Sequence, residues 1–185
     1  MPDLAGKKVI YFGFSGIIDP NGVTRLAAAF NAAVNDAADE IYLCMSSLGG
    51  YVGDGLFLYN HIRGLPPPIT IHNTGSIASI AAIVYVAASH RVCSAHAMFM
   101  MHPTTIGPFA EGVSWERLDG SLKTALADDQ RTENILRERT SLTDDLLAAK
   151  RVREVQISPQ EALEFGLTHE IAEFSVPRGH QIIQI

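Results

Sequence analysis

The chain has 185 residues, a formal net charge of −6 and a hydrophobic content of 47%. This length corresponds most simply to a single domain, residues 1–185, that buries enough surface to fold without disulfides or metal ions. The acidic balance, with no basic stripe, excludes general nucleic-acid binding. No apolar run reaches the ~18 residues of a membrane span and the N-terminus lacks the apolar core of a signal peptide, so we expect a cytoplasmic protein without membrane contact.

Short apolar runs alternate with segments of helical periodicity through the first half of the chain. We expect strands at residues 9–12, 40–45, 69–73, 91–94 and 98–101, and helices around residues 26–34, 54–63 and 79–88. Such alternation is typical of parallel strands joined by right-handed crossovers. Ligands bind such sheets where strands end and helices begin.

The second half is more polar. Residues 112–140 are predicted to form one long helix with an apolar face, and residues 141–144 and 158–161 each carry a helix N-terminal capping signature. A last short strand is expected at residues 170–172, and the tail at residues 181–185 is expected to pack on the body.

Three features of the first half together suggest acyl-transfer chemistry. Ser79 ends a run of small residues where a strand turns into a helix, His102 follows a strand and precedes a proline, and Gly49 and Gly50 form a flexible turn. A serine needs a positioned base, and backbone N–H groups at Gly50 and Ile80 could hold an oxyanion. Taken singly, each feature has an ordinary alternative explanation: a helix cap, a structural histidine and a simple turn.

Four collinear segments between Val9 and Ala172 resemble the proteolytic subunit of the Clp protease, a serine peptidase family with the ClpP/crotonase fold. Residues 47–50 (Ser-Leu-Gly-Gly) resemble its Ser-Pro-Gly-Gly, and residues 75–79 (Gly-Ser-Ile-Ala-Ser) its nucleophile turn. Residues 100–103 (Met-Met-His-Pro) resemble the strand that carries its base. Residues 158–167 resemble its C-terminal Ser-Ala-x-Glu-Ala-x-x-Tyr-Gly-Leu, which related families share.

The resemblance implies an α/β fold with a repeated ββα spiral core over residues 9–103. A projecting handle helix would follow at residues 112–140, then C-terminal helices and a last strand at residues 141–185. Family subunits form heptameric rings that stack through the handle, so we expect a homo-oligomer acting on peptides or unfolded proteins. No cofactor and no metal ion is expected.

The resemblance also assigns roles to residues. Ser79 is the expected nucleophile and His102 the general base, while the N–H groups of Gly50 and Ile80 form the oxyanion hole. Two neighbouring residues, Gly49 and Leu48, are expected to shape the strand that binds an extended peptide.

Three departures from the family pattern matter. Glu154 stands where we place the family's triad aspartate, and a longer carboxylate needs different geometry to orient the histidine. Leu48 replaces the proline of Ser-Pro-Gly-Gly, which makes the turn less rigid. The chain also begins almost at the first core strand, without the N-terminal region that helps to dock an unfoldase, which leaves a Clp-type ATPase partner open.

Two alternatives to an active peptidase follow. The chain could be a catalytically weak scaffold or regulatory subunit in which Glu154 does not support the histidine. It could also be a crotonase-type thioester enzyme, but the nucleophile turn holds no acidic residue for proton transfer, and Ser79 and His102 would have no role there.

Overall fold

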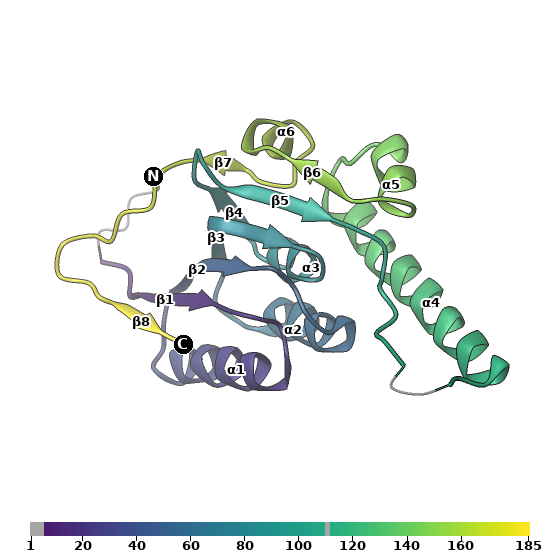
Figure 1. The fold of residues 1–185 in the computed structure, drawn as a ribbon. Coiled ribbons are helices and arrows are strands. Elements are labelled where there is room, and N and C mark those ends of the chain that lie inside the picture. Colours follow the sequence, from purple (N-terminus) through teal and green to yellow (C-terminus); the bar gives the residue numbers. More distant parts are fainter. Residues whose placement is uncertain (1–5, 110–111) are drawn as a thin grey trace.

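The computed structural model describes residues 6–109 and 112–185, in which one sheet of eight strands forms the centre of the molecule (Figure 1). The strand order is β6-β5-β3-β2-β1-β8, with β4 pairing β3 and β7 off this path. All pairs are parallel except β5 with β6. The strands are β1 (Val9–Ser15), β2 (Glu40–Ser47), β3 (Ile69–Ala78), β4 (His90–Cys93), β5 (Met98–Met101), β6 (Val155–Ile157), β7 (Glu170–Ile171) and β8 (Ile182–Gln184).

The helices connect these strands, and α5 and α6 begin at the two capping signatures that the sequence indicates. They are α1 (Pro20–Asn35), α2 (Val52–Gly64), α3 (Ala81–Val86), α4 (Trp115–Arg139), α5 (Asp144–Lys150) and α6 (Pro159–Glu164). The Ser158 side chain accepts the N–H of Glu161, whose carboxylate accepts the N–H of Ser158, so α6 begins with a complete capping box. Gly166, at φ +63°, follows this helix in the left-handed conformation that ends helices.

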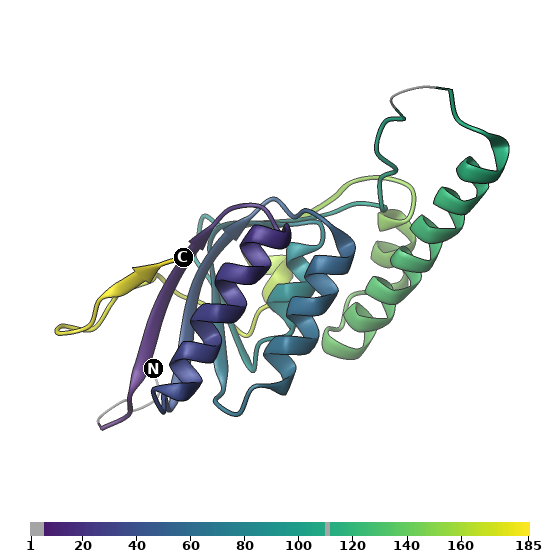
Figure 2. The same cartoon turned by 90° about the horizontal axis from the view of Figure 1, so that it is seen from below.

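The helices lie around the sheet in a way that leaves one of them projecting. Helices α1 and α2 cover one face of the sheet, and α4 stands beside the body with its N-terminal part extending beyond the other helices (Figures 1 and 2). Every residue of α3 is buried: its side chains other than Tyr85 are small or aliphatic, and the Tyr85 hydroxyl donates to the Val92 carbonyl. The long helix expected at residues 112–140 is present as α4, slightly shorter at each end.

Strand β3 is the element that places the candidate site, and it is longer than the sequence suggests. We expected it to end at Asn73, but it continues to Ala78 because it serves two neighbours in turn. Residues 70–73 pair with β4, and residues 76–78 pair with β5. The carboxyl ends of β3 and β5 therefore lie side by side, and the residues that follow them meet.

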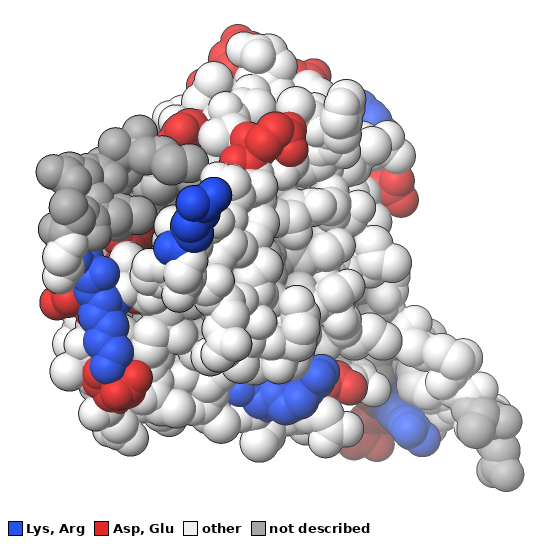
Figure 3. Space-filling view, turned by 90° about the vertical axis from the view of Figure 1, so that its left-hand side faces the viewer, with Lys and Arg blue, Asp and Glu red and all other residues white. Residues whose placement is uncertain are grey.

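The charged side chains of the described residues form no large patch on the face shown in Figure 3, and the two cysteines are buried. On the face shown in Figure 3, the lysine and arginine side chains of the described residues are scattered among uncharged and acidic ones. Within the described residues, no helix has the length and hydropathy needed to cross a membrane. Cys44 and Cys93 are both buried free thiols, and burial raises the pKa of Cys44 to about 12, so it is a poor nucleophile.

Candidate active site

Ser79 lies at a sharp turn between β3 and α3. Its φ angle of +57° is in the left-handed region, which residues with a side chain rarely adopt. The turn is held by the Ser79 N–H, which donates to the Met100 carbonyl on β5 at 2.8 Å. A strained strand-to-helix turn of this kind exposes the hydroxyl of a nucleophilic serine.

The Gly49–Gly50 turn lies directly against Ser79. A Cβ on Gly49, at φ +98°, would lie 2.6 Å from the Ser79 Cβ and 3.2 Å from its Oγ. A Cβ on Gly50 would lie 2.0 Å from the carbonyl oxygen of Ile18, so only glycine fits there. Within the described residues, the amide N–H groups of Gly50 and Ile80 have no backbone acceptor. Both are therefore available to an oxyanion formed beside Ser79.

His102 follows β5 and is held in one tautomer. Its Nδ1 lies 2.7 Å from the carbonyl oxygen of Pro103. Because a carbonyl oxygen can only accept, Nδ1 carries the hydrogen and donates it, which leaves Nε2 as the acceptor in the neutral ring. This is the tautomer that a general base requires. No hydrogen bond joins the Ser79 hydroxyl to this ring within the described residues, a looseness common in sites without substrate.

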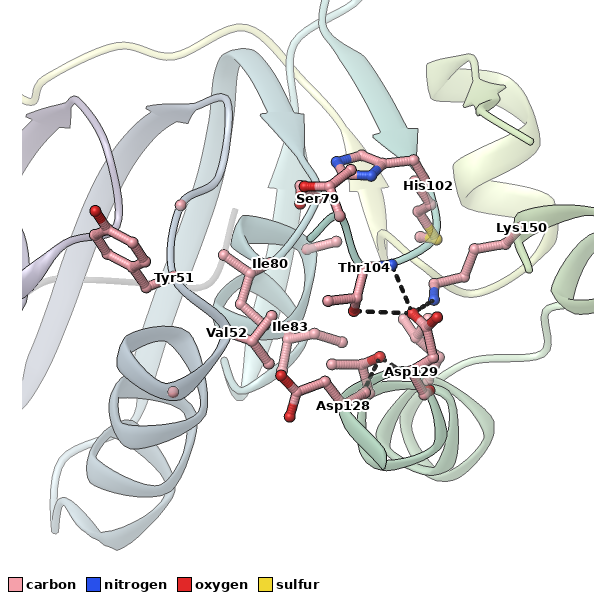
Figure 4. Close-up of a pocket in the computed structure, with 17 residues that line it drawn as sticks. Tyr51, Val52, Ser79, Ile80, Ile83, His102, Thr104, Asp128, Asp129 and Lys150 are labelled. Atoms are coloured by element: carbon pink, nitrogen blue, oxygen red, sulfur yellow. Dashed lines mark hydrogen bonds and ion pairs between the residues drawn. The ribbon is translucent and has the colours of Figure 1, made fainter. Parts of the chain in front are cut away.

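Ser79, His102, Gly50 and Ile80 all line one cavity of about 310 Å³. In Figure 4 the His102 ring extends toward Ser79. This volume is within the usual range for ligand pockets. The structure thus brings together the proposed nucleophile, base and oxyanion donors from three separate segments of the chain.

The same cavity contains charged residues that the sequence analysis missed. Asp128 and Asp129 from α4 and Lys150 at the end of α5 line it, beside Thr104 (Figure 4). Lys150 is buried, with 6% of its surface exposed, although nothing in its sequence neighbourhood distinguishes it from a solvated lysine. The aspartates fall in a polar helix, where acidic residues are ordinary surface groups.

Glu154, the expected third member, makes no hydrogen bond or ion pair with His102 within the described residues. It is exposed in the turn before β6, and its carboxylate accepts a hydrogen bond from Gln156 Nε2 at 3.1 Å. The ladder between β5 and β6 ends at the pair Met101–Val155, so Glu154 lies just beyond it. Glu154 is not among the described residues that line the cavity.

Three apolar side chains near the glycine turn are exposed, and one of them, Tyr51, lines the cavity. Leu48 is 75% exposed, Tyr51 67% and Ile17 61%. Exposed apolar residues beside a cavity are typical of ligand-binding surfaces.

No group of three or more histidine, cysteine, aspartate or glutamate side chains in residues 6–109 and 112–185 is arranged to hold a metal ion.

Comparison with known proteins agrees with this geometry. The family model described as Clp protease matches residues 16–175. The ATP-dependent Clp protease proteolytic subunit 2 of Pseudomonas aeruginosa is 27% identical over 142 residues, 76% of this chain and 68% of that protein. The ATP-dependent Clp protease proteolytic subunit of Paracoccus denitrificans is 25% identical over 159 residues, 85% of this chain and 78% of that protein.

A solved structure shares the fold. A ClpP1 mutant from Listeria monocytogenes superimposes with a TM-score of 0.76 at 19% identity, covering 90% of this chain and 92% of that one. At this identity the match establishes the fold alone, and it confirms the α/β class and the ClpP-like architecture expected from the sequence.

Proposed function

The chain belongs to the Clp protease family and is a serine-type endopeptidase by that membership, and we propose that Ser79 and His102 carry out its reaction. The observation that carries this assignment is the left-handed turn at Ser79, which faces one cavity together with a histidine in the base tautomer. The glycine turn and the two available N–H groups support the same assignment.

The proposed reaction has two stages. Ser79 Oγ attacks the peptide carbonyl while His102 Nε2 takes the hydroxyl proton, and the N–H groups of Gly50 and Ile80 hold the oxyanion. The intermediate then collapses to an ester on Ser79, and His102 returns the proton to the departing amine. Water, activated by His102, attacks the ester and releases the acid, which restores the serine.

The substrate proposed is an extended segment of a peptide or an unfolded protein. Gly49 and Leu48 precede the oxyanion donor; Leu48 is largely exposed, as is Tyr51, which lines the cavity. An extended chain could bind this edge through backbone hydrogen bonds and place apolar side chains on these residues.

We propose that the chain works as a homo-oligomer of heptameric rings, stacked through α4, with the sites inside. The relatives named above are described as proteolytic subunits, that is, as parts of a larger assembly. Helix α4 also exposes an apolar stripe at helical spacing: Trp115 is 81% exposed, Leu118 48%, Leu122 50% and Leu126 59%. Such a stripe on a projecting helix supports self-association, and native mass measurement tests it.

The cell compartment proposed is the cytoplasm, since both cysteines are buried free thiols, as is usual in a reducing compartment. The names of the relatives describe an ATP-dependent protease, so a Clp-type ATPase is the partner class to test. Co-purification of such an ATPase with the assembled protein, in the presence of a slowly hydrolysed ATP analogue, is the direct assay.

A catalytically weak subunit is the second candidate, and one observation favours it. Glu154 is exposed, its carboxylate accepts a hydrogen bond from Gln156, and it has no hydrogen bond with His102 within the described residues. This candidate predicts normal ring assembly without an activated serine.

Reaction with a fluorophosphonate probe separates the two candidates, because the probe labels only activated serines. We expect one adduct per chain by intact mass, lost in Ser79→Ala. The matched control is Ser76→Ala, which removes a hydroxyl three residues earlier, on β3. Assembled protein that takes up no probe would contradict the peptidase assignment and support the weak subunit.

A further inference from the structure

The cavity holds a buried ion pair that the proposed reaction does not use. Lys150 Nζ lies 3.3 Å from Asp129 Oδ1, and their side chains are only 8% and 17% exposed. Burying two charges costs free energy that their attraction often fails to recover, so such a pair is weak evidence for stability alone. Both residues of the pair line the same cavity as His102, which suggests that the pair has a functional role (Figure 4).

Asp129 binds the segment that immediately follows the histidine. Its Oδ1 accepts the backbone N–H of Thr104 at 2.9 Å and the Thr104 hydroxyl at 3.0 Å, in addition to the Lys150 ammonium. One carboxylate oxygen on α4 is therefore hydrogen-bonded both to Lys150 at the end of α5 and to Thr104, just after β5.

The Thr104 N–H belongs to the same peptide group as the Pro103 carbonyl. That carbonyl accepts the His102 Nδ1–H at 2.7 Å. A peptide group is planar and its N–H and C=O point in opposite directions, so fixing one end fixes the other. Accepting the N–H on a carboxylate also polarises the group and makes its carbonyl a stronger acceptor.

We propose that Asp129, held by Lys150, is a positioning residue that orients His102 through the Pro103–Thr104 peptide group. In a serine triad an acidic residue bonds the histidine directly; in this chain the peptide group lies between acid and base. This inference rests on the proposed function of Ser79 and His102. It assigns the orienting role to a carboxylate on α4, whereas Glu154 is exposed outside the cavity.

The test must avoid leaving one buried charge without its partner, which alone would destabilise the protein. Two double variants meet this need: Asp129→Asn with Lys150→Met, and Asp129→Ala with Lys150→Met. Both remove the ion pair, but only asparagine keeps an oxygen that accepts the Thr104 N–H. The matched surface control is Asp36→Ala with Lys8→Met, which removes an exposed pair with an N–O distance of 2.8 Å.

Hydrolysis of a fluorogenic peptide amide gives kcat and KM, and thermal unfolding checks folding. We expect the alanine double variant to have a kcat about 100-fold below the asparagine one, with KM changed less than about threefold. The two should unfold at similar temperatures, and the surface control should match the wild type. Thr104→Val keeps the N–H and should lose less activity than the alanine double variant.

Equal kcat in the two double variants would overturn the positioning role, as would a loss that merely follows the folded fraction. A loss from Glu154→Gln as large as that of the alanine double variant would overturn it too. Ser79→Ala is measured in parallel to separate this failure from that of the proposed function. If Ser79→Ala is inactive, equal kcat refutes the positioning role alone; if it is fully active, both assignments fail.

Discussion

Replacing Gly50 with alanine tests the oxyanion hole through geometry that the structure fixes closely. The new Cβ would lie 2.0 Å from the Ile18 carbonyl oxygen and 2.7 Å from its carbon, both backbone atoms that cannot rotate away. Relieving this contact requires the turn to move by about 1 Å, because a Cβ essentially never comes closer than 3.0 Å to another heavy atom. The Gly50 N–H would move with the turn, away from the oxyanion.

The expected size of the effect follows from this displacement. Misplacing a catalytic group by about 1 Å costs about 100-fold in rate, and losing one oxyanion donor costs about 100- to 1,000-fold. We therefore expect kcat for peptide hydrolysis to fall about 100- to 1,000-fold in Gly50→Ala, equivalent to about 2.7–4 kcal/mol.

The control for this variant is Gly64→Ala at the end of α2, where a Cβ meets nothing within 4 Å. It should keep the wild-type rate. The assay is peptide hydrolysis beside thermal unfolding, so that loss of rate is separated from loss of fold. A folded Gly50→Ala protein with wild-type kcat would refute the placement of the oxyanion hole at this turn.

Three further predictions concern the base and two charged groups. His102→Ala should lower kcat about 1,000-fold at unchanged thermal stability, measured by peptide hydrolysis; a smaller loss than tenfold would argue against its role as base. Partial desolvation and the nearby charge of Arg91 lower the pKa of the partly exposed His169 to about 4. The unfolded chain therefore takes up this proton first, and stability falls as the pH drops from about 6.5 toward 4. The free energy of unfolding in urea, measured at pH 7 and at pH 5, should drop by about 1 kcal/mol less in His169→Gln than in the wild type. An equal drop in the two proteins would refute this role of His169. Hydrogen bonds from Arg151 and Arg137 lower the pKa of Glu133, so its carboxylate stabilises the fold above its unfolded pKa and the effect disappears as pH falls through the lowered value. Glu133→Gln should thus lose about 1–2 kcal/mol of stability at pH 7, and this difference should shrink as the pH falls below the unfolded glutamate pKa of about 4.3. A difference that does not change with pH would contradict this reasoning.

The sequence predicted the alternation of strands and helices well, because apolar runs and capping residues are local signals. The start of α6 at Pro159 and the buried helix after Ser79 are examples. The far half of β3 could not be predicted, because Gly75, Ser76 and Ala78 have weak strand preference and this stretch forms a strand through pairing with β5. Strand β6 escaped prediction because it has only three residues, and its pairing with β5 is set by the fold.

The residues of the site likewise fall into two groups, those with a local sequence pattern and those that meet only through tertiary packing. Ser79, His102 and the two glycines were predicted because each lies in a short segment with a recognisable pattern. Asp129 and Lys150 were not, because their meeting with Thr104 depends on how α4 and α5 pack against the end of β5. Glu154 was predicted from its place in the chain alone, and the chain position did not reveal that its carboxylate bonds to Gln156.

Peptide hydrolysis by the assembled wild-type protein, beside Ser79→Ala and Ser76→Ala, tests the central claim most directly. The account predicts that Ser76→Ala cleaves the peptide at the wild-type rate, whereas Ser79→Ala cleaves it no faster than buffer. Cleavage by Ser79→Ala at the wild-type rate would contradict the claim that Ser79 is the nucleophile.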